Sequence, residues 1–284
     1  MALLATALSL AATAPARAEP ATWTIRDKDS TILLFGSVHV LPAGLDWRPD
    51  ALDAALAQAD DLWFETPADP AQSGAAAQLA RQYGYLGADQ SLIDQLTPKG
   101  REQLKRVCVR LGIAPAAIDR LKPWLADISL SVAVLATQGA SADSGVERIL
   151  TEAAPATAQR RYFETTSEQI LMFAQAPTTD QLASLEDTLR QLDEDPAFFE
   201  RLIGAWLDGD QTEIVALGVA PLKTVSPVLY QRLLVERNRR WAEVIAQRLA
   251  GSGETVIVVG AAHLAGPDGV PALLRARGIV VEGP

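Results

Sequence analysis

Cysteine is almost absent from this chain, since Cys108 is the only one among its 284 residues. A single cysteine forms no internal disulfide and provides no thiolate set for a structural zinc site. Cys108 lies at helical spacing with Leu104 and Leu111. This pattern favours a small buried side chain on a helix over a reactive nucleophile.

Positive charge is also scarce. The chain has 25 Lys and Arg against 35 Asp and Glu, which gives a formal net charge of −10. An acidic protein repels nucleic acid and anionic lipid, so we expect neither as a partner.

Long apolar runs are missing beyond the N-terminus. Residues 2–13 form an apolar stretch that is too short to span a membrane as a stable helix, and the signal-peptidase pattern Ala16-x-Ala18 follows it. We expect residues 1–18 to be a signal peptide cleaved after Ala18. This predicts a periplasmic or secreted protein with no transmembrane anchor after cleavage. Residues 19–284 contain no repeat or low-complexity linker, which predicts a single domain.

Alternating strand-like and helical runs predict an α/β fold with a central mixed sheet, flanking helices and a helical insertion in the middle. A hairpin is expected at 22–25 and 31–35. Further strands are predicted at 62–64, 161–163, 255–259 and 278–281. Helices are predicted at 50–59, from Pro98 onward, and at 123–138, 180–194, 196–207, 227–249 and 269–277.

Several helix starts carry local signals. Thr97 followed by Pro98 predicts one N-terminus, and Ser144 with Glu147 predicts a capping box for another. A further box is expected from Thr165 with Glu168, or from Thr166 with Gln169. The nearly all-apolar helix 123–138 is expected to be buried.

The two histidines end the same kind of phrase. His39 closes the run that begins at Thr31, His263 closes the run that begins at Thr255, and each run is an apolar strand followed by Gly-x-x-His. Histidine suits both proton transfer and metal ligation. Gly36 and Gly260 would let the chain turn sharply and approach a bound ligand or cofactor closely.

Four predicted strands each end near a potential ligand: His39, Glu65, Glu164 and His263. If these strands are neighbours in one sheet, the four side chains converge at its carboxyl edge. Such a set suits a divalent transition metal such as Mn, Co or Zn, or iron. Each residue alone also fits an ordinary core or solvated position, and only the pairing of the histidines favours a shared site.

Arg237 and Asn238 interrupt the apolar face of the helix 227–249. A charge and an amide on a core-facing stripe need partners, which a buried carboxylate or a substrate oxyanion could supply. The alternative is that Arg237 extends along the helix to water.

At these residues the chain resembles the TraB/GumN family, whose animal relatives include the Tiki proteases. The matching segments are residues 34–42, 63–65, 145–147, 163–165 with Gln169, 237–238 and 258–266. The resemblance implies a Tiki-like fold and a Mn- or Co-dependent peptidase. By this analogy His39, Glu65, Glu164 and His263 ligate metal or move protons, while Arg237 and Asn238 hold the site or the substrate.

Two functions therefore remain open. The first is a metal-dependent hydrolase, foremost a peptidase, acting on a peptide or another small substrate. The second is a non-catalytic periplasmic protein that binds haem, metal or a peptide in the same pocket. The oligomeric state is not predicted.

Overall fold

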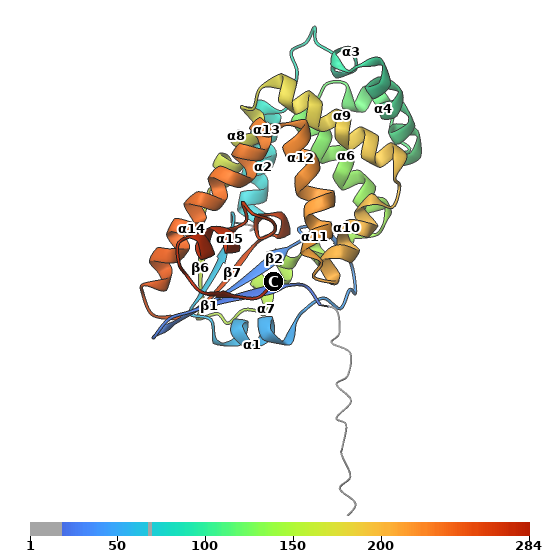
Figure 1. The fold of residues 1–284 in the computed structure, drawn as a ribbon. Coiled ribbons are helices and arrows are strands. Elements are labelled where there is room, and N and C mark those ends of the chain that lie inside the picture. Colours follow the sequence, from blue (N-terminus) through green and yellow to red (C-terminus); the bar gives the residue numbers. More distant parts are fainter. Residues whose placement is uncertain (1–18, 68–69) are drawn as a thin grey trace, which may run out of the picture.

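A six-stranded mixed sheet forms the centre of the computed structural model, which describes residues 19–67 and 70–284 (Figure 1). The predicted signal peptide lies outside the described residues. The strand order is β6-β4-β7-β2-β1-β8. The strands are β1 (Thr22–Arg26), β2 (Ser30–Ser37), β4 (Asp61–Phe64), β6 (Gln159–Tyr162), β7 (Gly253–Gly260) and β8 (Val281–Glu282). This sheet and the helices around it confirm the predicted α/β class.

Four neighbouring strands run parallel. β2 pairs with β7 from Ser30–Gly253 to Ser37–Gly260, and β4 lies between β7 and β6. Their carboxyl ends therefore meet at one edge of the sheet, as the sequence predicted. The hairpin β1–β2 and the short strand β8 complete the opposite side.

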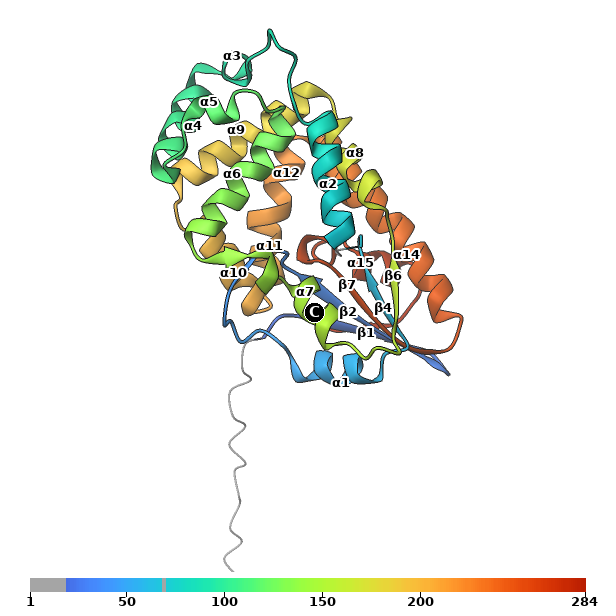
Figure 2. The ribbon, with the colours of Figure 1, turned by 180° about the vertical axis from the view of Figure 1, so that it is seen from behind.

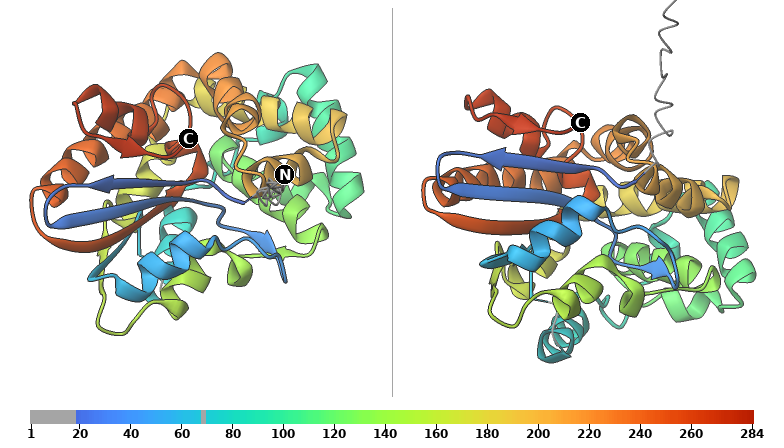
Figure 3. Two further views of the ribbon diagram at one scale, coloured as in Figure 1. Left: turned by 60° about the horizontal axis from the view of Figure 1, so that its bottom comes forward. Right: turned by 90° about the horizontal axis from the view of Figure 1, so that it is seen from below.

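Helices cover both faces of the sheet (Figure 3). Alternating side chains of the buried strands pack against these helices. Leu33 and Phe35 of β2 face α1 (Asp50–Gln58) and α7 (Val146–Ala153). Ile32 and Leu34 face the other side, where α14 (Glu236–Leu249) and α15 (Val270–Ala276) pack. The period of two along each strand is what divides the core into these two layers.

A helical lobe stands beyond the carboxyl ends of the parallel strands (Figure 2). Its core includes Leu104, Leu130 and Leu185, and Cys108 is fully buried there, as predicted. Its helices are α2 (Pro70–Tyr83), α3 (Leu92–Gln95), α4 (Pro98–Leu111), α5 (Pro115–Ile118), α6 (Pro123–Thr137), α8 (Thr166–Ala174), α9 (Thr178–Glu194), α10 (Phe198–Leu207), α11 (Gln211–Ile214), α12 (Ala220–Val225) and α13 (Pro227–Tyr230). The short strands β3 (Leu41–Pro42) and β5 (Ala140–Ser141) pair beside it.

Two local predictions are confirmed at helix starts. The Thr97 hydroxyl accepts from the Gly100 N–H at the start of α4. Thr165 and Glu168 form the predicted capping box of α8.

Two other local predictions are wrong. Ser144 and Glu147 form no capping box, because Gly145 is the N-cap of α7 and makes no side-chain cap bond. The helix α6 is buried on one face only, since Ile128 is 39% exposed and Val132 is 45% exposed. An apolar composition does not specify how many sides of a helix find neighbours.

The predicted helix 227–249 is continuous but changes its winding. Between α13 and α14, residues Gln231–Val235 form a π-helical turn, and a second such turn covers Val215–Val219. π-Turns occur frequently at functional sites. Within the described ranges, no helix is both long and apolar enough to cross a membrane.

Trp206 joins the lobe to the sheet, because its buried indole Nε1 donates to the main-chain oxygen of Gly36 at 2.8 Å. The indole Nε1 of Trp124 is also buried but has no partner among the residues that the structure describes. We therefore expect Trp206→Phe to lower the free energy of unfolding by about 1 kcal/mol more than Trp124→Phe, as measured by urea denaturation. Equal losses in the two variants would show that this bond does not stabilise the fold.

Candidate functional site

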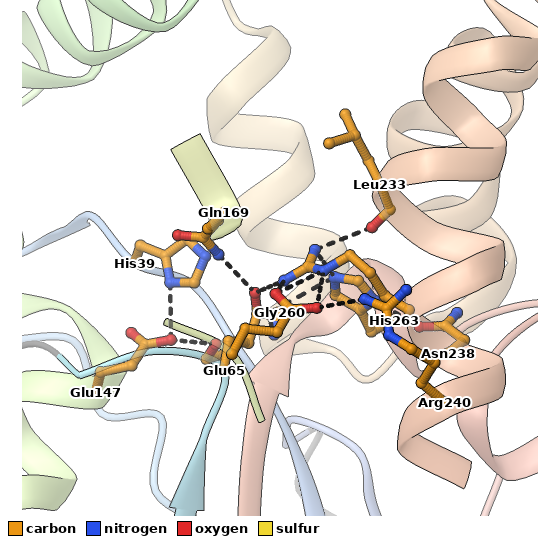
Figure 4. A network of polar contacts seen from close by, with 12 residues as sticks. His39, Glu65, Glu147, Gln169, Leu233, Asn238, Arg240, Gly260 and His263 are labelled. Atoms are coloured by element: carbon orange, nitrogen blue, oxygen red, sulfur yellow. Dashed lines mark hydrogen bonds and ion pairs between the residues drawn. The ribbon is translucent and has the colours of Figure 1, made fainter. Parts of the chain in front are cut away.

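The predicted site residues do meet at the carboxyl edge of the parallel strands (Figure 4). His39 follows β2, Glu65 follows β4 and Glu164 follows β6. His263 ends a short 3-10 turn, Ala261–His263, directly after β7. Arg237 and Asn238 reach the same place from α14.

Arg237 is the centre of this group. Its Nη2 donates to Glu65 Oε2 at 2.6 Å, and its Nε lies 2.9 and 3.0 Å from the two oxygens of Glu164. All three side chains are almost fully buried, with exposed fractions of 5%, 8% and 4% for Arg237, Glu65 and Glu164. Arg237 thus has the buried carboxylate partners that its place on an apolar helix face predicted. The alternative, in which its side chain extends to water, is wrong.

The π-turn before α14 helps to orient Arg237. Its Nη1 donates to the main-chain oxygen of Leu233, which belongs to that turn, at 2.9 Å. The guanidinium also lies over the ring of Trp241, 4.6 Å from its centroid, in a cation–π contact. Backbone geometry and aromatic packing together restrict where this charge can lie.

Glu65 is held as a carboxylate. Its Oε1 accepts from the Gly260 N–H at 2.7 Å, and its Oε2 accepts from Gln169 Nε2 at 3.1 Å. Burial alone would raise the pKa of Glu65, but the surrounding imidazole and guanidinium groups and the Gly260 N–H lower the pKa to about 2.

His263 is a neutral imidazole with a defined tautomer. Arg237 Nη1 can only donate, so His263 Nε2 accepts from it at 2.9 Å. Nδ1 then carries the proton and donates to Asn238 Oδ1 at 2.6 Å. Asn238 is oriented in turn, because its amide nitrogen donates to the Asp268 carbonyl at 2.8 Å. Burial lowers the pKa of His263 to about 3.

His39 differs from His263 because its side chain is 62% exposed. Its Nδ1 lies 2.7 Å from Glu147 Oε1, and the Ser37 hydroxyl donates to the same oxygen at 2.5 Å. The Glu147 carboxylate raises the pKa of His39 to about 9. Gly145 allows this arrangement, since a Cβ there would lie 2.1 Å from the His39 carbonyl oxygen.

Gly260 leaves a space that three predicted ligands surround. A Cβ at this position would lie 3.1 Å from Glu65 Oε1, 3.8 Å from His39 Nε2 and 3.6 Å from His263 Cδ2. Neither Gly36 nor Gly260 has a positive φ, so the backbone conformation does not require glycine at either position. Both permit close approach, because a Cβ at Gly36 would lie 3.0 Å from the Ala261 Cα.

The residue types around this space are ones that a divalent transition metal prefers, although they form a narrower set than predicted. Each histidine has its Nδ1 held by an oxygen and its Nε2 edge toward Glu65, which is the usual arrangement of metal-binding imidazoles. The three atoms nearest to this space belong to Glu65, His263 and His39 rather than to Glu164, whose oxygens bind Arg237 and Arg240. No group of three or more ligand-type residues is spaced to hold an ion in residues 19–67 and 70–284. His39, Glu65 and His263 could hold one only if Arg237 Nη1 left His263 Nε2.

Three residues of the network were not expected in it from the sequence. Glu147 and Gln169 matched helix-cap patterns, and Arg240, which donates to Glu164 at 3.1 Å, carried no signal that singled it out. A local pattern cannot reveal that residue 147 meets residue 39. The Gly145–Glu147 and Gln169 matches to the family were the available signal for two of them.

The two histidines make the electrostatics directly measurable, because an NMR titration contains only their two imidazole signals. We expect His39 to titrate near pH 9 and His263 to stay neutral down to about pH 3. In Glu147→Gln, the pKa of His39 should fall toward its ordinary 6.5 while that of His263 stays unchanged. Glu152→Gln, on the exposed face of the same helix, is the control and should change neither.

The same shifts predict the pH range of greatest stability. The pKa of His39 is raised in the folded state. Its contribution to the free energy of unfolding is therefore complete below about pH 6.5 and is lost as the pH rises through 9. The pKa of His263 is lowered, so its contribution to the free energy of unfolding is present above pH 6.5 and is lost as the pH falls through 3.

In the NMR titration, a His39 that titrates near pH 6.5 with and without Glu147 would contradict the proposed pairing of His39 with Glu147.

Comparison with known proteins agrees with the sequence motifs. The chain is 27% identical over 251 residues to "Uncharacterized protein YbaP" of Escherichia coli (strain K12), covering 85% of this chain and 87% of that protein. It is 22% identical over 269 residues to an "Uncharacterized protein" of Treponema pallidum (strain Nichols), covering 90% and 80%. No solved structure matches it significantly. The model of the TraB/PrgY/gumN family matches residues 21–283. The chain therefore belongs to the TraB/PrgY/gumN family.

Proposed function

We propose that this protein is a metal-dependent hydrolase that cleaves an amide bond, foremost in a peptide, at the space next to Gly260. The observation that carries the proposal is the arrangement of the two imidazoles. Glu147 holds Nδ1 of His39 and Asn238 holds Nδ1 of His263, while the Nε2 edges of both rings border the space next to ionised Glu65.

His39, Glu65 and His263 would hold the ion, which is expected to be Mn, Co or Zn. When bound there, a divalent ion lowers the pKa of a coordinated water and polarises a substrate carbonyl. Arg237 keeps Glu65 in place and neutralises Glu164, and Gln169 fixes the second oxygen of Glu65. These contacts orient the ligands before the substrate arrives.

Activated water suits the chain better than a protein nucleophile. Ser37 is the hydroxyl nearest to His39 in the sequence, and it donates to Glu147 rather than to the imidazole. Cys108 is buried in the core of the helical lobe. The proposal also places the protein in the periplasm or outside the cell, because an apolar stretch and Ala16-x-Ala18 precede the domain.

A second candidate is a non-catalytic protein that binds a metal, a peptide or haem at the same place. One observation favours it: Arg237 occupies His263 Nε2, so the buried network is complete without further chemistry. A binder would retain its ligand stoichiometrically and release no product.

Elemental analysis combined with a peptide-cleavage assay tests the proposal. After loading with Mn, Co or Zn, the wild-type protein should retain about one ion per chain and cleave peptides. His39→Ala and His263→Ala should each lose both properties. Glu200→Gln, which changes an exposed carboxylate on α10, should keep both.

The outcomes separate the two candidates. Cleavage that survives both histidine variants would contradict the proposed site. Ion retention that depends on both histidines, without cleavage of any peptide, would favour the binding protein.

A further inference from the structure

A cavity of about 410 Å³ lies between α8 and α14 and has no assigned role. It borders Glu164 at the edge strand β6, whereas His39 follows β2, with β4 and β7 between them. His39, Glu65 and His263 are not among its walls. The cavity is therefore distinct from the space next to Gly260, although the ion pairs of Glu164 with Arg240 and Arg237 connect the two. Its volume lies in the range of small-molecule sites.

One wall of the cavity carries two guanidinium groups. Arg232 and Arg240 lie eight residues apart on one face of the same continuous helix. The side chain of Arg240 is 56% exposed, and a single one of its nitrogens bonds within the described part of the chain, to Glu164. Arg232 donates a hydrogen bond from Nη1 to the main-chain carbonyl oxygen of Gln175. Both retain N–H groups that could bind an incoming carboxylate.

Apart from Gln175, the rest of the lining is apolar or acidic. Leu171 and Met172 of α8, together with Phe163, provide an apolar surface. Glu236 lies between the two arginines on their helix, and Glu168 lies across from it on α8. The cavity thus offers cationic, anionic and apolar contacts within the span of one small molecule.

We propose that this cavity binds an α-amino acid with an apolar side chain, either free or as the carboxyl-terminal residue of a peptide. The ligand's carboxylate binds Arg240, its side chain covers Leu171 and Met172, and a free ammonium group is attracted by Glu236. A simple anion gains nothing from the acidic residues, and a simple cation is repelled by the arginines. The proposal goes beyond the hydrolytic function and does not depend on it.

The position of the cavity gives such a ligand a route to the site. A carboxylate on Arg240 competes with Glu164 for the same guanidinium. Glu164 in turn binds Arg237, which binds Glu65 and His263. The ligand is therefore connected to Glu65 through three ion pairs: Arg240–Glu164, Glu164–Arg237 and Arg237–Glu65.

Isothermal titration calorimetry with three probes tests the proposal: L-leucine, N-acetyl-L-leucine and L-leucinamide. The wild-type protein should bind L-leucine and should not bind L-leucinamide, which lacks the carboxylate. Arg240→Gln should weaken binding of L-leucine at least about tenfold, since a charge-assisted pair is lost. Arg239→Gln, the neighbouring exposed arginine outside the cavity, is the matched control and should bind as the wild type does.

The probes also distinguish the two sources of the ligand. Binding of N-acetyl-L-leucine as tightly as L-leucine would assign the cavity to peptide carboxyl ends, and weaker binding would assign it to free amino acids. Met172→Glu is a second variant that leaves Arg240 and Glu164 in place and should also abolish binding, because its carboxylate repels that of the ligand.

His39→Ala separates this site from the proposed hydrolytic one. Leucine binding should survive in His39→Ala even where ion binding is lost. The proposal is overturned if the wild type binds neither L-leucine nor N-acetyl-L-leucine, if Arg240→Gln binds as the wild type does, or if His39→Ala abolishes binding.

Discussion

The geometry of the carboxyl edge depends on one ion pair network, in which Arg237 lies between Glu65 and Glu164. All three groups are nearly inaccessible to water. Charges removed from water are tolerated only when they are paired and hydrogen-bonded. Arg237 supplies a guanidinium to both carboxylates, and Arg240 supplies a second one to Glu164. Arg237 comes from α14, while the carboxylates follow β4 and β6. The network therefore fixes the long helix against the sheet edge, and it also positions His263 and Gln169 through Arg237 and Glu65.

The same network determines what the site can bind. Arg237 sets the tautomer of His263 by occupying Nε2, and Asn238 completes that arrangement through Nδ1. Under the proposed function, an ion must replace the contact of Arg237 with His263 Nε2, while Arg237 keeps its contact with Glu65. Arg237 still has the Leu233 carbonyl of the π-turn as a partner for Nη1. The Arg237 guanidinium can thus release the His263 imidazole and still bind Glu65 and Glu164. Under the proposed function, a buried ion pair and a metal site can therefore lie side by side.

Much of this arrangement was predictable from the sequence, because it follows from regular patterns. Four strand-like runs ending near His39, Glu65, Glu164 and His263 predicted the parallel strands and their common edge. Arg237 on an apolar stripe predicted a buried partner. The pairing of Glu147 with His39 was not predictable, since a Ser-x-x-Glu pattern looks the same whether or not the carboxylate is drawn away by an imidazole 108 residues earlier. The exposed face of α6 and the exclusion of Glu164 from the ligand set likewise depend on neighbours that no local pattern specifies.

Arg237 is required for the stability of the fold because it pairs two buried carboxylates. Urea unfolding of Arg237→Met, compared with the triple variant that also carries Glu65→Gln and Glu164→Gln, tests it most directly. We predict that Arg237→Met loses about 3–5 kcal/mol of unfolding free energy, because buried Glu65 loses its guanidinium partner and buried Glu164 keeps only one of its two, Arg240. The triple variant should recover most of this loss. A small effect of Arg237→Met, or a triple variant no more stable than the single one, would contradict the account.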